Sequence, residues 1–252
     1  MISVTLEANM ADTPAKRKPT ALLVMLALAI CLFVGLGTWQ VYRLQWKLAL
    51  IERVDSRVHA APVAAPDSSE WRSITAVSDE YRHVSLSGVF LDSQTVRVQA
   101  VSALGAGYWV LTPLRRADGS IVLVNRGFVD PEQAATAGSP QGRNVTLTGL
   151  LRITEPGGAF LRHNDPTAGR WYSRDVQAIA QQEKLSNVAP YFVDADAAQN
   201  VAQNADKAAP VAGLTVVAFH NNHLVYALTW YALALMSAFA CFGLLRAKPR
   251  HE

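Results

Sequence analysis

The chain has 252 residues, of which 50% are hydrophobic and 17% are charged, and its formal net charge is +3. So many apolar residues with so few charges exclude an intrinsically disordered chain, and the small net charge argues against a nucleic-acid-binding protein. Two cysteines are too few for a disulfide-rich scaffold or a four-cysteine zinc site.

The apolar residues concentrate in two charge-free runs, one near each end of the chain. The first covers residues 20–42 and the second covers residues 224–245. A helix needs about 20 residues to cross a hydrocarbon core, so both runs are long enough to span a membrane. The alternative is a buried core helix, which rarely has so long an uninterrupted apolar run. The sequence therefore predicts two transmembrane helices.

The residues that flank these runs indicate a retained anchor and an orientation. The first run is longer than the apolar part of a signal peptide, and WQVYRLQWK follows where small residues would mark a cleavage site. Basic residues precede the first run at 16–18 and follow the second at 246, 248 and 250. By the positive-inside rule, we expect both tails (1–19 and 246–252) to be cytoplasmic and the large loop to be periplasmic.

The first helix is expected to continue beyond the membrane through residues 43–59, since no Gly or Pro interrupts it. Trp39, Tyr42 and Trp46 fit an aromatic belt at the membrane interface, where Arg43 can reach lipid headgroups. Stretches rich in Ala, Pro and Ser predict two tethers, at 60–71 and 195–213.

Between the tethers, residues 72–194 predict a mainly β domain. Runs rich in Val, Leu, Ile and aromatic residues are separated by Gly, Pro, Asn or Asp, which is typical of strands joined by turns. Asp118-Gly119 is a strong hairpin signal, because this pair readily adopts positive φ. A short helix is expected at 175–185 with Asp175 as its N-cap. The predicted strands are 81–90, 95–101, 108–115, 121–128 and 145–153, with further candidates at 191–193 and 214–219.

Together these elements predict a membrane protein in which two transmembrane helices flank a small antiparallel barrel or sandwich of α+β character. Residues 214–223 are expected to lead from this periplasmic domain, as a strand, into the second transmembrane helix.

Several chemistries are excluded or only weakly indicated. Neither a P-loop, nor a dinucleotide-binding, zinc-protease or nucleophile-elbow motif occurs in the sequence. Cys31 and Cys241 both lie in the apolar runs, which leaves the loop between them without a thiol for redox or copper chemistry. His83 on a predicted strand is expected to be a surface residue. His163 and Asp165 lie in an Asn-Asp-Pro turn signal, and they leave a membrane-tethered hydrolase as the enzymatic alternative.

The most distinctive group of residues opens the second apolar run. On a helix, His223, Trp230 and either Tyr226 or Ala227 share one face at offsets of three, four and seven. An imidazole beside an aromatic surface at the membrane suits axial ligation of a haem iron. The competing interpretation is an amphipathic interfacial belt without a ligand, and the residues alone leave both open. Asn221 and Asn222 are positioned to cap the helix.

Four blocks of sequence resemble the surfeit-locus family of cytochrome c oxidase assembly factors, in the family's order. They are LGTWQVYRLQWK from residue 36, GYWVLTPLRRADGSIVLVNRGFV from residue 107, RWYSRDV from residue 170 and NNHLVYALTWYALA from residue 221. The resemblance covers nearly the whole chain and is weakest in the two tethers. It implies a non-enzymatic chaperone, of the bacterial inner membrane in this case, with no catalytic residues.

The resemblance also implies partners and a cofactor. The partners would be cytochrome c oxidase subunit I, other assembly factors and the lipid bilayer, with no nucleic acid. The step would be at or near the supply of haem a, bound through the iron ligand His223 with Trp230 beside it. A cofactor-free scaffold that stabilises oxidase subunits is the alternative. Arg126 is expected to pair with a carboxylate, and Gly127 to serve the backbone geometry. Residues assigned an interaction or structural role are Trp39, Arg43, Gly107, Arg126, Gly127, Asn222 and Tyr226.

Overall fold

The computed structural model describes residues 20–132, 144–159, 161–197, 210–214 and 221–246. The chain divides into two compact units. The described part of the helical unit is residues 20–49 and 221–246, and that of the β unit lies between residues 50 and 214.

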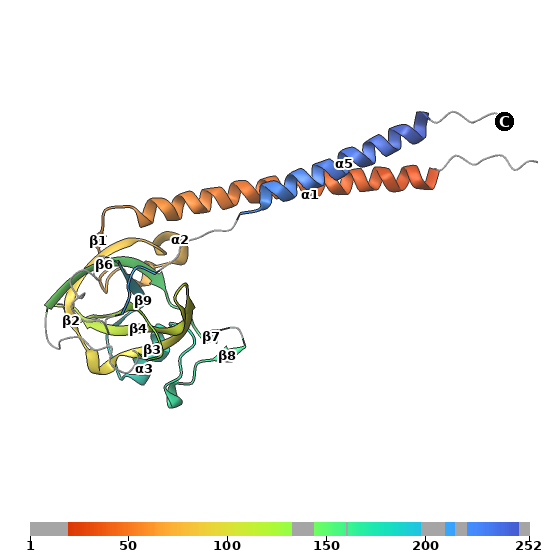
Figure 1. Ribbon diagram of the computed structural model, residues 1–252. Helices are drawn as coiled ribbons and strands as arrows, with labels where there is room; N and C mark the ends of the chain where they lie inside the picture. The colour runs from red at the N-terminus through yellow and green to blue at the C-terminus, as the bar shows by residue number, and fades with distance from the viewer. Residues whose placement is uncertain (1–19, 133–143, 160, 198–209, 215–220, 247–252) are drawn as a thin grey trace, which may run out of the picture. The chain divides into compact units, whose positions relative to one another are not determined.

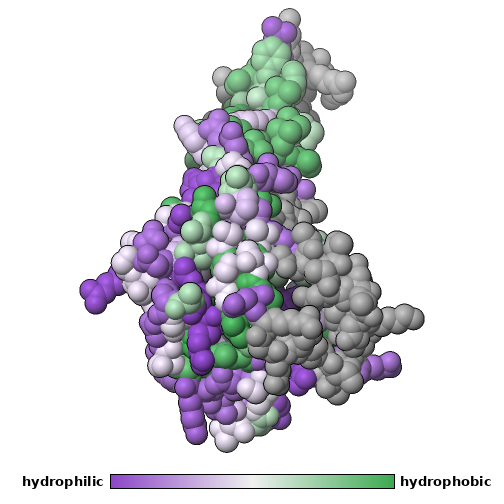
Figure 2. Space-filling model, turned by 90° about the vertical axis from the view of Figure 1, so that its left-hand side faces the viewer, coloured by the Kyte–Doolittle hydropathy of each residue, from purple (hydrophilic) through white to green (hydrophobic). Residues whose placement is uncertain are grey.

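The helical unit is a pair of helices, α1 (Thr20–Val58) and α5 (His223–Arg246), shown in Figure 1. Both are long and apolar enough to cross a membrane, and they contain the two predicted spans in full. Helix α1 runs on to residue 58, through most of the extension expected at 43–59, and its last residues belong to the β unit. In Figure 2 the surface of the helices is mostly hydrophobic, whereas the visible face of the β unit is more hydrophilic.

A stripe of half-buried and buried residues marks where the two helices pack. Along each helix these residues recur at alternating spacings of three and four, which keeps them on one face of a long helix. The remaining faces expose large apolar side chains, such as Met25 at 65% and Leu28 at 66%, as lipid contact requires. The stripe residues are 26, 30, 33, 37 and 40 on α1 and 223, 227, 230 and 234 on α5.

The β unit is built on a seven-stranded sheet in the order β1-β2-β6-β9-β5-β4-β3, and a β2–β4 pairing closes five of these strands into a barrel. Most neighbours are antiparallel, but β5–β9 and β1–β2 are parallel. The fold expected from the sequence is thereby confirmed. The strands are β1 (Val63–Ala64), β2 (His83–Phe90), β3 (Val96–Ser102), β4 (Gly105–Arg115), β5 (Ile121–Val129), β6 (Asn144–Ile153) and β9 (Val188–Ala195).

Shorter elements complete the unit. Strands β7 (Gly158–Ala159) and β8 (Arg162–His163) form a small hairpin, and α2 (Ala76–Asp79) precedes β2. Helix α3 (Val176–Gln182) begins after Asp175, whose carboxylate accepts a hydrogen bond from the Ala178 N–H at 3.1 Å, as the predicted N-cap requires.

The first five predicted strands correspond to β2 to β6, and their ends differ by at most three residues. The predicted hairpin between β4 and β5 is present, with Gly119 at φ +80°. The strand candidate 191–193 extends to 188–195 as β9. Most of the candidate strand 214–219 lies outside the described residues, and Leu214 itself is not in a strand.

Strand β5 separates two apolar cores, and all nine of its residues are buried. Val122 and Val124 point into the barrel, where they pack with Tyr191 and Val193 of β9. Leu123 faces the other way and packs against Ile179 of α3. Because both faces of the strand are covered, its first four residues, Ile121–Val124, are all apolar rather than alternating.

The two stretches expected as tethers contribute residues to the β unit. In 60–71, β1 pairs with β2, Ala65 is 4% exposed, and the Tyr191 hydroxyl donates to the Pro66 carbonyl at 2.8 Å. In 195–213, Val211 pairs with Phe128 of β5. Small Ala and Pro side chains predict a linker by composition, yet they also fit closely against a sheet, and here the packing decides the outcome.

Candidate functional site

His223 is the first residue of α5, and it is held by groups from both helices of the pair. Its ring Nδ1 lies 2.7 Å from the Gln40 Oε1 of α1. Its backbone N–H donates to the Asn221 side chain at 3.3 Å, and the Tyr226 N–H donates to the Asn222 carbonyl, so the two asparagines start the helix. The imidazole therefore has a fixed position at the end of the helix pair.

The aromatic part of the predicted group is on the same face as His223. Trp230 stacks on Phe33 of α1 with ring centroids 5.8 Å apart and 23° between the planes. Ala227 is 2% exposed, whereas Tyr226 is 54% exposed. The choice left open by helical spacing is thus resolved: Ala227, not Tyr226, lies between His223 and Trp230 on the packed face.

A second polar contact joins the helices at Tyr231, eight residues after His223 on α5. The hydroxyls of Thr38 and Tyr231 lie 3.1 Å apart. A Cβ at Gly37 would come within 2.8 Å of the Tyr231 ring, so glycine is needed there for the close approach. The helix pair is therefore fixed at two places, Thr38–Tyr231 and Gln40–His223.

Trp39 and Arg43 lie away from the contact between the helices. Trp39 is 57% exposed, and the Arg43 guanidinium lies 4.1 Å from the centre of the Trp46 ring. An exposed aromatic residue and an arginine stacked on another ring suit the membrane interface expected from the sequence. They are not part of the His223 group.

Arg126 and Gly127 of β5 serve the packing of the β unit. The Arg126 guanidinium pairs with Asp92 at 3.1 Å, with both side chains below 10% exposed, which confirms the carboxylate partner that the sequence predicts. Gly127 has φ +131°, and a Cβ there would lie 2.4 Å from the Val211 backbone. A Cβ at Gly107 would similarly meet the Val129 carbonyl at 2.3 Å. Gly107 and Gly127 therefore allow β4 and the segment around Val211 to approach β5 closely.

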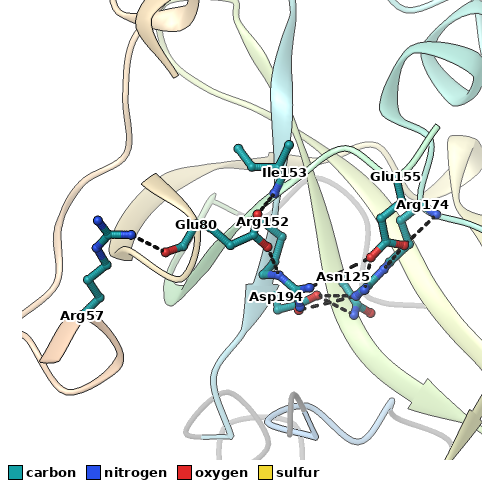
Figure 3. A network of polar contacts seen from close by, with 8 residues as sticks. All are labelled: Arg57, Glu80, Asn125, Arg152, Ile153, Glu155, Arg174 and Asp194. Carbon is teal, nitrogen blue, oxygen red and sulfur yellow. Dashed lines mark hydrogen bonds and ion pairs between the residues drawn. The ribbon is translucent and has the colours of Figure 1, made fainter. Parts of the chain in front are cut away.

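A buried polar network centres on Asp194 of β9 (Figure 3). Asp194 is 3% exposed and accepts hydrogen bonds from Asn125 at 2.8 Å, Arg152 at 2.9 Å and Arg174 at 3.2 Å. Glu80 pairs with Arg152 at 2.8 Å, and Glu155 pairs with Arg174. Sequence reasoning missed this network, although Asn125 and Arg174 belong to two of the blocks that carry the resemblance.

The charges in the network perturb one another. Burial opposes ionisation of Glu155, but the hydrogen bonds and the charge of Arg174 prevail and hold the pKa of that carboxyl below its ordinary value. Burial alone would lower the pKa of Arg152, but the contacts with Asp194 and Glu80 outweigh it and raise the pKa above its ordinary value. Arg57 at the end of α1 donates to the Glu80 carbonyl at 3.1 Å, so the network also secures the start of the β unit.

His83 is half-buried rather than exposed on the surface. Its Nδ1 lies 2.7 Å from the Ala60 carbonyl and its Nε2 lies 2.8 Å from the Asp196 carboxylate. Because both partners are acceptors, the ring must carry both protons to satisfy them. Burial alone would lower the pKa of His83, but the Ala60 and Asp196 contacts outweigh it and raise the pKa.

Of the two residues considered for a hydrolase, Asp165 closes a turn and His163 lies on a strand. Asp165 accepts from the Ala168 N–H at 3.1 Å and pairs with Arg170 at 2.7 Å, so its carboxylate closes the turn predicted from Asn-Asp-Pro. His163 is exposed on β8. Across the described ranges, no three His, Cys, Asp or Glu residues gather as a metal site.

Comparison with known proteins matches the chain over most of its length. A family model described as the SURF1 family matches residues 27–235. Surfeit locus protein 1 of Homo sapiens is 33% identical over 248 residues, which is 90% of this chain and 78% of the human protein. The Mus musculus protein of that name is 34% identical over 228 residues, 82% and 70% of the two chains. A SURF1-like protein of Monosiga brevicollis is 34% identical over 230 residues, 85% and 83%.

Proposed function

Since the chain belongs to the SURF1 family, we propose that it is an assembly factor for haem-copper cytochrome c oxidase. It acts on the maturation of subunit I, at or near the insertion of haem a, and it works as a non-enzymatic chaperone together with other assembly factors. The observation that supports the haem step is His223, held between the two helices by Gln40 at 2.7 Å.

The residues around His223 fit a haem. Gln40 Oε1 can only accept, so Nδ1 of His223 carries the proton and Nε2 keeps the lone pair that binds an iron. Within the described part of the chain, no hydrogen bond occupies Nε2. His223 would hold the iron, and Trp230 would offer apolar aromatic surface to the porphyrin. Haem a would bring the iron centre, and the protein would supply the His223 ligand and the apolar surroundings.

The two apolar helices support a membrane location. The exposed apolar faces of α1 and α5 suit a bilayer, and we propose that the protein lies in the bacterial inner membrane with both termini cytoplasmic. The β unit is then periplasmic. There it can contact the parts of subunit I and of other assembly factors that protrude from the membrane.

The alternative of a cofactor-free scaffold rests on the β unit. Its buried network joins Asn125, Arg174 and Asp194 into one rigid body that could grip oxidase subunits without any haem. The two functions differ in their dependence on His223, because that side chain has no part in the network.

A deletion strain complemented with variants tests the proposal. Wild type and the control His163→Ala, which changes an exposed histidine of the β unit, should both restore oxidase with its haem a absorption. His223→Ala should restore much less. Restoration equal to wild type by His223→Ala would favour the scaffold. Normal oxidase in the deletion strain would refute both and return attention to the hydrolase.

A further inference from the structure

Gln40 is the one side-chain amide within the apolar run 20–42, and it lies on the contact face of α1. It is 9% exposed. A polar side chain inside a membrane helix is unfavourable unless it meets a partner, and such residues usually serve a function. Its partner here is His223 Nδ1, at 2.7 Å from Oε1.

This contact selects one form of the imidazole. A neutral histidine carries its proton on either Nδ1 or Nε2, and only the nitrogen without the proton can bind a metal. The carbonyl oxygen of Gln40 accepts but cannot donate, so it stabilises the form with Nδ1–H. In that form the Nε2 lone pair is free to bind iron, and the ring is held in one orientation.

We propose that Gln40 is the positioning residue of this site: it fixes the tautomer and orientation of His223 and so directs the Nε2 lone pair toward a haem iron. The haem part of this inference rests on the proposed function, whereas the tautomer part does not. A neutral amide suits this role, because it accepts a hydrogen bond without placing a charge among apolar helices.

The alternative is that Gln40 only stabilises the packing of the two helices. The structure supplies a matched control for that possibility. The Thr38–Tyr231 contact, at 3.1 Å, also joins α1 to α5 through polar side chains, but it does not touch His223. A purely structural role would make Gln40→Leu and Thr38→Val equivalent, whereas a positioning role would separate them.

The first experiment reads the tautomer in the full-length protein without haem. Isotope-edited nitrogen NMR distinguishes protonated from unprotonated ring nitrogens, and His223→Ala identifies the signals of that ring. In wild type and Thr38→Val, Nδ1 should be protonated and Nε2 not. In Gln40→Leu, the proton should shift toward Nε2, and Gln40→Glu, which keeps an acceptor oxygen, should restore the wild-type form. A proton on Nε2 in wild type would overturn the inference.

The second experiment measures the affinity for haem a and the midpoint potential of the bound haem. Loss of a hydrogen-bonding partner behind a metal-ligating histidine typically weakens binding by about 10–100-fold, so Gln40→Leu should bind haem a at least about ten-fold more weakly. Its midpoint potential should rise, since an imidazole without the hydrogen bond to Gln40 donates less electron density and stabilises ferric iron less. Thr38→Val should match wild type in both respects.

The outcomes separate this inference from the proposed function. If wild type binds haem a and Gln40→Leu keeps the same affinity and potential, Gln40 does not position His223, although the haem site stands. If wild type binds no haem a, the proposed haem step fails, while the tautomer experiment still decides whether Gln40 acts on His223.

Discussion

Replacement of Asp194 by alanine should destabilise the β unit more than any other single loss of charge in it. The carboxylate is 3% exposed and accepts from Asn125 at 2.8 Å, Arg152 at 2.9 Å and Arg174 at 3.2 Å. Its removal leaves two largely buried guanidinium groups, Arg152 and Arg174, paired with Glu80 and Glu155. Removing one partner of a buried ion pair typically costs about 3–5 kcal/mol, a large part of the stability of an ordinary domain.

Hydrogen exchange on the full-length protein in detergent measures this effect where it matters. Amides of β5 and β9 should exchange through global opening of the β unit, so their protection reports its free energy of unfolding. Asp165→Ala is the matched control, since it also removes an ion pair with arginine, but from an exposed turn. The reasoning is refuted if the Asp194 and Asp165 variants lose protection equally in these strands.

Four further predictions follow from the same structure. Gly127→Ala should destabilise the β unit by about 1–3 kcal/mol through backbone strain, and by more because its Cβ collides with Val211. Gly119→Ala places its Cβ in open space, so it should cost the backbone strain alone. Chemical denaturation of the two variants compares these losses of stability. The raised pKa of His83 implies stability that is fully present below its ordinary value of 6.5 and is lost as the pH rises through the folded value. His83→Gln should therefore flatten this part of a stability–pH profile, and an unchanged profile would contradict the double contact. His223→Ala should lower oxidase assembly in the complemented strain, and Gln40→Leu should move the ring proton of His223.

Much of the fold could be predicted because its signals are local. The charge-free runs predicted α1 and α5, and runs rich in Val, Leu, Ile and aromatic residues between turn residues predicted β2 to β6. The extent of β9 and the packing of residues 60–71 could not be predicted in this way. They depend on pairing with strands far along the chain, and composition alone cannot distinguish a flexible tether from a small-residue segment packed on a sheet.

The sequence predicted the residues that α5 contributes to the candidate site, but not Gln40 of α1. Helical spacing placed His223 and Trp230 on a common face, but it could not choose between Tyr226 and Ala227, because the choice depends on where the other helix lies. Gln40 is 183 positions from His223, and only its amide in an apolar run could have indicated it. The Asp194 network was missed for the same reason, since its members are brought together by the barrel.

The amount of haem a that copurifies with the full-length protein tests the central claim most directly. Wild type and His223→Ala are each expressed in the same strain that makes haem a and then purified. Their reduced-minus-oxidised spectra are scaled to the protein concentration. We expect haem a with wild type and a large loss with His223→Ala, while His163→Ala keeps the wild-type amount. Equal haem a in wild type and His223→Ala, or none in either, would contradict the account.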